Sequence, residues 1–277
     1  MKPMLIIFGI TIAALFSNYA VAEESDFRVL EYDVLLEGED AGDITLKLVQ
    51  TEEGYLIVEH NQIKVPGWWG DINITTILSE EFQHGSGFIN SDSKTVADGT
   101  AYWSRISRRD DGYLGAYTEI SKIDQHETQQ FSRLSSALTG RDQFKAEEII
   151  ARSRTIFSAR AESAHTHRVK FTQNAFSTTL YDFPFFIQRR AGKPLPKKIN
   201  ILDAQGMEVH QVSISDLGVE ILLVGKEKLQ VRHLLISGGK YKPSHLWLKE
   251  AGTSFPYIIR HVGEDEDGMF EIILKAD

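Results

Sequence analysis

The stretch from Val219 to Leu235, VEILLVGKEKLQVRHLL, decides the fold class. Its apolar residues alternate on both sides of a short turn at Gly225: first Val219, Ile221 and Leu223, then Leu229, Val231, His233 and Leu235. Alternation at period two is typical of a half-buried antiparallel strand. Glycine suits a tight reversal because it adopts positive φ without strain. The stretch therefore predicts a β-hairpin with one covered face.

The same pattern extends in both directions, from Met207 to Leu274. Phe270, Ile272 and Leu274 share one further parity, and turn-forming residues recur at 216–218, 237–239 and 264–268. These features predict an antiparallel meander. A meander must cover its apolar face, so the rest of the chain should supply the cover.

The N-terminal part, from Phe27 to Ile123, also predicts strands. Tyr32, Val34 and Leu36 alternate, a turn follows at 38–42, and further strand-like segments recur about every ten residues up to Tyr117. Regular short strands of this kind are typical of a sandwich, a barrel or a partly open barrel.

The pattern becomes helical in the middle of the chain, over 125–165. Phe131, Leu134 and Leu138 fit one helical face, and a second helix is expected over 141–165. A third apolar segment, 176–187, predicts a short helix that plugs or caps the sheet, with a kink or break at Pro184. We expect these helices inside or across the concave side of the sheet.

The first 22 residues predict a secretory signal peptide. Lys2 precedes an apolar run, and Ala20-Val-Ala22 places small residues before a cleavage point at Glu23. The alternative is an uncleaved anchor, but the run is shorter than the roughly 20 residues that span a membrane. We therefore predict a single β-rich domain over 23–277, made of N-terminal strands over 23–124, the helical stretch 125–165 and C-terminal strands over 166–277.

Composition limits the compartment and the partners. There is no cysteine, so the chain is not a lipoprotein and has no disulfides, and the signal peptide predicts a periplasmic location. Removing Lys2 leaves 29 basic against 39 acidic residues, a net charge near −10. This charge argues against nucleic acid or an anionic membrane surface as a partner, although one face can still be basic. After cleavage no segment is apolar enough to span a membrane, and the sequence does not predict an oligomeric state.

Four motifs have simple structural interpretations. The run 84–87, HGSG, predicts a glycine turn and lacks the pattern of a nucleophile elbow. His165 and His167 predict a surface pair without further metal ligands in reach. His233 predicts a buried, hydrogen-bonded imidazole. The acidic run 264–267 predicts a solvated hairpin tip, because its carboxylates are contiguous. We expect no catalytic residue, metal or cofactor.

Tryptophans are the candidate ligand-binding residues. Trp68 and Trp69 are adjacent, so on a strand one faces the core and the other faces outward. An exposed indole offers an apolar face to a sugar, a lipid chain or a protein. Trp103 and Trp247 are expected to line the concave side, with ordinary core packing as the alternative for all four.

Several segments resemble uncharacterised exported bacterial proteins that are grouped as periplasmic domains of unknown function. The resemblance covers about the last hundred residues and, more weakly, the first thirty, and it omits the helical stretch. It is carried by these segments: 32–34 with Gly38 and Gly42, 180–187, 199–206, the Gly225 hairpin, 246–248 and 255–259. The resemblance implies an envelope location and a β-rich fold but no reaction. The architecture is similar to the curved half-barrels that carry lipoproteins and lipids across the periplasm.

The sequence thus favours a mainly β protein, with an antiparallel meander that forms a curved sheet or incomplete barrel and a helical insertion in the middle. The expected function is non-catalytic: binding a lipid or other apolar ligand, or serving as an envelope assembly partner. Two alternatives stay open. One is an envelope hydrolase or carbohydrate-active enzyme with dispersed acid and base residues. The other is an interaction module that docks through 125–165.

Overall fold

The computed structural model describes residues 27–66, 70–136, 164–239, 241–250, 253, 255–264 and 268–276. The described part is mainly β, as the sequence predicts. Its strands are β1 (Phe27–Leu36), β2 (Glu39–Gln50), β3 (Gly54–Val65), β4 (Ile72–Gln83), β5 (Gly87–Ala97), β6 (Thr100–Arg109), β7 (Gly112–Ser121), β8 (His165–Thr172), β9 (Thr178–Thr179), β10 (Lys198–Asp203), β11 (Glu208–Val224), β12 (Glu227–Gly238), β13 (Tyr241–Lys249), β14 (Tyr257–Glu264) and β15 (Met269–Leu274). The helices are α1 (Gln125–Ser136) and α4 (Phe183–Gln188).

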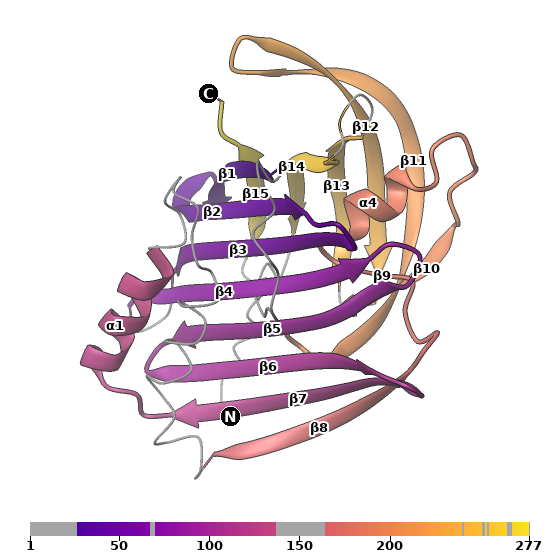
Figure 1. The fold of residues 1–277 in the computed structure, drawn as a ribbon. Helices are drawn as coiled ribbons and strands as arrows, with labels where there is room; N and C mark the ends of the chain where they lie inside the picture. Colours follow the sequence, from indigo (N-terminus) through magenta and orange to yellow (C-terminus); the bar gives the residue numbers. More distant parts are fainter. Residues whose placement is uncertain are drawn as a thin grey trace.

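All fifteen strands form one open, strongly curved sheet (Figure 1). Its order is β8-β7-β6-β5-β4-β3-β2-β1-β15-β14-β13-β12-β11-β10-β9. Each neighbouring pair is antiparallel except β9 with β10. The first and last strands meet in the middle of the sheet, where Tyr32 is the partner of Leu274. The edges β8 and β9 are not paired with each other, so the predicted fold of a curved sheet or incomplete barrel is confirmed as an open, curved sheet.

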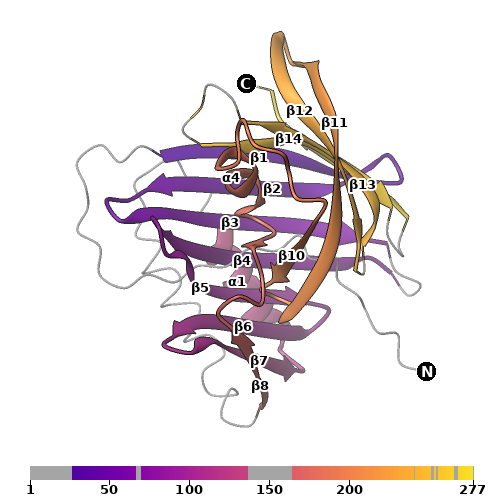
Figure 2. The same cartoon turned by 90° about the vertical axis from the view of Figure 1, so that its right-hand side faces the viewer.

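The curved sheet has two arms, β1–β8 and β9–β15, and its second arm turns back over the first. In Figure 2, α4 and β10 lie in front of the strands of the first arm. Hydrogen bonds join the two arms: Gln205 Nε2 donates to Ser93 Oγ and Thr95 Oγ1, both at 3.2 Å, and Ser104 Oγ donates to the Ala204 carbonyl at 3.2 Å. These contacts hold the β10 end of the second arm across β5 and β6.

Parity assigns the apolar residues of the first arm to two faces. Ile57 and Leu78 belong to the core between the arms, whereas Ile77, the neighbour of Leu78, belongs to a separate cluster on the opposite face. That second cluster includes Phe131 of α1. Phe131 is fully buried, as predicted for the apolar face of this helix. The expectation that the middle helices lie on the concave side is therefore wrong for α1.

Helix α1 begins with a capping box that the sequence analysis did not identify. Asp124 Oδ1 accepts from the Glu127 amide at 2.8 Å, and Glu127 Oε2 accepts from the Asp124 amide at 2.8 Å. This reciprocal pair satisfies two of the amide groups that a helix start leaves free. Residues 137–163, which include Leu138 and most of the second expected helix, lie outside the described residues.

The predicted helix at 176–187 is shorter than expected. Thr178 and Thr179 form β9, which runs parallel to β10 at Ile201 and Leu202. Helix α4 begins only at Phe183, and Pro184 lies in its first turn instead of kinking it. Proline is tolerated there because a first-turn amide has no helical partner to lose. The prediction that this helix caps the sheet is confirmed, since α4 is buried from Phe183 to Ile187 and contacts β9 and β14.

None of the helices in the described ranges is long and apolar enough to cross a membrane.

Candidate functional site: a cavity between the two arms

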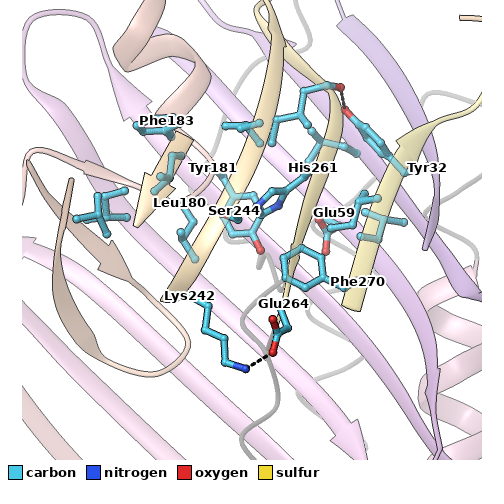
Figure 3. Close-up of a pocket in the computed structure, with 18 residues that line it drawn as sticks. Tyr32, Glu59, Leu180, Tyr181, Phe183, Lys242, Ser244, His261, Glu264 and Phe270 are labelled. Carbon is cyan, nitrogen blue, oxygen red and sulfur yellow. Dashed lines mark hydrogen bonds and ion pairs between the residues drawn. The ribbon is translucent and has the colours of Figure 1, made fainter. Parts of the chain in front are cut away.

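An apolar cavity of about 150 Å³ lies on the inner side of the curve (Figure 3). Strands β1, β2 and β3 form one wall, and β10 to β15 form the other. The chain leading into α4 closes part of the space with Leu180, Tyr181 and Phe183. Eleven aliphatic or phenylalanine side chains line it: Ile44, Leu46, Leu180, Phe183, Ile201, Val212, Ile236, Leu246, Ile258, Phe270 and Ile272. Both arms of the sheet are therefore needed to build the cavity.

Glu59 is the acidic group deep in this cavity. Its side chain shares the parity of Tyr55 and Ile57 on β3, so it points to the interior with them. Glu59 is only 2% exposed, and Asn61 Nδ2 donates to its Oε1 at 3.0 Å. Burial raises the pKa of Glu59 well above its usual value, and nearby Glu80 raises it further. Burial therefore favours the neutral carboxylic acid form of Glu59, which has a proton to donate.

Two more polar side chains line the opposite wall. Ser244 on β13 and His261 on β14 form a hydrogen bond of 3.1 Å between Oγ and Nε2. Burial lowers the pKa of His261 to about 4, so its imidazole is neutral at pH 7. The ring of Phe270 meets this imidazole edge to face, with centroids 5.0 Å apart. Gly263 makes room for the arrangement, since a Cβ there would lie 2.7 Å from Phe270 Cζ and 2.8 Å from Ser244 Cβ.

An ion pair marks the outer end of the cavity. Lys242 Nζ lies 2.5 Å from Glu264 Oε1, and both side chains are about half exposed. In Figure 3 this pair lies below Phe270, away from His261 and Glu59. The cavity thus has charged groups at its rim and an apolar wall with a few buried polar groups inside, which is the usual design of a small-molecule site.

Beside the cavity, a set of buried polar contacts fastens α4 to the first arm. We call Tyr55, Glu80, Thr179, Asp182 and Arg189 the polar seam. Asp182 accepts from Tyr55 OH and from Arg189, whose Nη1 and Nη2 lie 3.0 and 2.7 Å from its two oxygens. Thr179 Oγ1 donates to Glu80 Oε2. Burial raises the pKa of Glu80 to about 8, against the opposing effect of the Thr179 hydrogen bond. Each of these groups has a protein partner, so the polar seam is structural.

The tryptophans lie elsewhere. Trp68 and Trp69 are outside the described residues. Trp103 on β6 packs against the cluster that contains Phe131, on the opposite face of the sheet. Trp247 on β13 stacks on His233 with centroids 4.4 Å apart, and its indole N–H donates to Glu220. Neither Trp103 nor Trp247 is among the residues that line the cavity, and Trp247 packs against the core cluster that contains Tyr32. Their role in ligand binding stays a prediction.

The structure places the 84–87 run and His233, whereas the surface pair of His165 and His167 stays a prediction. The run 84–87 includes the turn between β4 and β5, with positive φ at Gly85 and Gly87. His233 is partly buried and contacts His245 Nδ1 at 2.8 Å and Glu220 at 3.1 Å. Among the described residues, no group of three or more acidic or histidine side chains is arranged to hold a metal ion. The acidic residues 265–267 and the side chain of His165 lie outside the description.

Sequence reasoning missed the residues that line the cavity. One signal was present: Glu59 lies within the strand GYLIVEHNQIKV at the parity of Tyr55, Ile57 and Ile63. An acid on an apolar parity is uncommon unless it is paired or neutral. Ser244, His261 and Lys242 carry no comparable signal, because β13 and β14 reach Glu59 only through the curvature of the whole sheet.

Comparisons of the chain with protein-family models, with curated proteins and with solved structures give no match.

Proposed function

We propose that this protein binds the apolar part of a small ligand in the cavity between its arms and acts as a non-catalytic carrier or binding protein of the cell envelope. The observation that carries the proposal is the apolar cavity of about 150 Å³ with the buried acid Glu59 inside, whose neutral form is favoured by burial. An apolar cavity of that size holds a molecule about as large as benzene. An export signal over residues 1–22 and a periplasmic location belong to the same proposal.

The lining indicates the chemistry of the ligand. Aliphatic and phenylalanine walls favour an alkyl or aryl group, which gains roughly 0.8 kcal/mol for each buried methylene. Glu59 in its acid form offers a hydrogen bond to a neutral acceptor such as a hydroxyl, ester or amide oxygen. A ligand anion would have to enter a wall without a described cation beside Glu59, since Lys242 is engaged by Glu264 at the rim. We therefore propose an uncharged amphiphile with one polar group.

A series of n-alkanols, titrated by calorimetry, tests this function. Each added methylene should tighten binding about fourfold, the ratio that corresponds to roughly 0.8 kcal/mol, until the cavity is full. Ile236→Phe fills part of the cavity and should weaken binding of the longest alkanols. Ile221→Phe makes the same change at an exposed position away from the cavity and should leave binding unchanged. Absence of binding, or affinity that is independent of chain length, would reject the proposal.

Ester hydrolysis is a second candidate, favoured by the contact between Ser244 and His261. A neutral imidazole 3.1 Å from a serine hydroxyl can accept its proton as the oxygen attacks an ester carbonyl. Within the described ranges, no carboxylate hydrogen-bonds His261 to orient it, which is why we place ligand binding first. Turnover of a short p-nitrophenyl ester that Ser244→Ala abolishes, with alkanol binding retained, would reverse this order.

A further inference from the structure

The β11–β12 hairpin carries an exposed apolar row. Val219, Ile221 and Leu223 are 61%, 68% and 68% exposed, and Leu217 beside them is half exposed. The described residues contain six exposed large hydrophobic side chains, and these four lie on one strand. The sequence pattern predicted the strand correctly, but the expectation that this face is covered is wrong. A grouped apolar surface of this kind marks a site of interaction.

The hairpin extends beyond the rest of the sheet (Figure 2). The pairing of β12 with β13 ends at Arg232 and Leu248, so the hairpin from Val219 to Val231 has no other neighbouring strand. Val219 is the partner of Arg232, and Arg232 is the partner of Leu248. The exposed row therefore lies on the same face as buried Leu248 and continues the inner apolar face into solvent.

Basic residues lie at the tip of this row. Lys228 is the partner of Leu223 and shares its face, and Lys226 lies in the turn. Neither lysine forms an ion pair with a described residue. Arg232, farther from the tip, is held by Asp216 at 2.7 Å and Glu250 at 3.1 Å. Glu227 lies between the two lysines and is the partner of Val224, so it belongs to the face opposite to Leu223 and Lys228. The row face at the tip thus presents lysine beside apolar side chains, a combination that suits an anionic lipid surface.

The size of the row argues against a second copy of the chain as the occupant. A stable protein interface uses about 20–30 residues on each side. The apolar row offers four. A lipid surface makes no such demand, because an apolar strip can enter the boundary between headgroups and acyl chains without a complementary partner.

We propose that the β11–β12 hairpin docks the protein on an anionic bilayer surface, with Val219, Ile221 and Leu223 in the lipid boundary and Lys226 and Lys228 on lipid phosphates. The net negative charge of the chain does not oppose this, since the contact is local and the Debye length is about 8 Å at physiological salt. The proposal is independent of the cavity. If both are correct, the inner apolar face brings a ligand close to the membrane from which it enters or leaves.

Single-cysteine labelling tests the docking, because the chain has no cysteine of its own. Ile221→Cys carries a polarity-sensitive dye on the row, and Met269→Cys carries it at another exposed apolar position, 47% exposed, outside the hairpin. Vesicles of phosphatidylethanolamine and phosphatidylglycerol (3:1) should blue-shift the dye at 221 and leave the dye at 269 unchanged. Phosphatidylcholine vesicles should produce a much smaller shift at 221.

Substitutions separate the two parts of the contact. Ile221→Asn with Leu223→Asn should lower the vesicle partition coefficient at least tenfold, and Lys226→Gln with Lys228→Gln should lower it severalfold on the anionic vesicles only. Equal dye shifts at 221 and 269, or none, would overturn the proposal. So would a wild-type dimer that the asparagine pair makes monomeric in sedimentation velocity without any vesicle binding. The labelled proteins keep the test decisive if the asparagine pair fails to fold.

Discussion

Glu59 and Glu80 are buried on adjacent strands and point to the same side of the sheet, yet their surroundings differ. Glu80 belongs to the polar seam and accepts a hydrogen bond from the hydroxyl of Thr179, which lies on the second arm. Glu59 faces an apolar cavity that the fold leaves unfilled. Both acids have a raised pKa because of burial. The comparison teaches that burial alone does not distinguish a structural acid from a candidate ligand-binding one. What matters is whether the acid faces a space that the protein leaves unfilled.

The strongest test of the polar seam is Asp182→Ala. This carboxylate accepts from Tyr55, Thr178 and Arg189, so its removal leaves several donors unsatisfied beside the core. We expect the free energy of unfolding to fall by about 3–5 kcal/mol, measured by urea titration. Asp216→Ala breaks a more exposed ion pair with Arg232 and should lower it by less than about 1 kcal/mol. Equal effects of the two substitutions would contradict a structural role for the polar seam.

The next test is the pH dependence of stability that Glu80 contributes. Its folded-state pKa of about 8 lies above the ordinary value, so the folded state holds the proton more tightly than the unfolded state. Stability from this group is complete below about pH 4.5 and is lost as the pH rises toward 8. Between pH 5 and pH 8, the free energy of unfolding of Glu80→Gln should therefore rise by about 3 kcal/mol relative to that of the wild type.

The difference between the two proteins is the quantity to measure. His60 and His261, whose pKa values burial lowers to about 4, lose stability in the opposite direction as the pH falls below 6.5, and they do so in both proteins. Urea midpoints of wild type and Glu80→Gln at several pH values provide the measurement. A difference in stability between wild type and Glu80→Gln that does not change with pH across this range would mean that Glu80 is ionised in the folded protein.

The smallest effect is expected when Glu59 ionises, and the property affected is alkanol binding. Raising the pH ionises Glu59 and places a charge in an apolar wall, so alkanol affinity should fall by at most tenfold per pH unit above its pKa. Tyr32, Tyr181 and His261 share the cavity with Glu59, and the rim pair of Lys242 and Glu264 completes its ionisable groups. Glu59→Gln should bind with no such pH dependence, whereas Glu80→Gln should keep it. The same slope in both variants would assign the effect to another group.

The local sequence pattern was sufficient to predict most of the strands. The alternation of apolar residues along Val219–Leu223 or Phe270–Leu274 can be recognised from residues that are adjacent in the sequence. The local pattern failed where a distant segment decides the outcome. Val219, Ile221 and Leu223 alternate like the residues of a covered strand, but their side chains are exposed where the β11–β12 hairpin extends past β13. Thr178 and Thr179 form a strand only because β10 is beside them, in a stretch whose aromatic residues predict a helix.

The cavity could not be predicted from the sequence, because segments that are distant in the sequence form it. Its walls come from strands at both ends of the described chain, and no spacing places Glu59 opposite His261. The tryptophans are large side chains, yet Trp247 stacks on His233 and is not among the residues that line the cavity. The one local clue was chemical: a glutamate on the apolar parity of β3.

The pairing of β1 with β15 has a consequence for how the chain reaches its native state. The two edges of the sheet, β8 and β9, follow each other in the sequence, so a chain that began at β9 and ran through β15 into β1 and on to β8 would consist almost wholly of adjacent hairpins. In the natural order, the pairing of Tyr32 with Leu274 joins residues that are far apart in the sequence, and this separation raises the contact order of the whole domain. A circular permutant opened between β8 and β9 should fold faster than the natural chain, because the most distant closure becomes a local one.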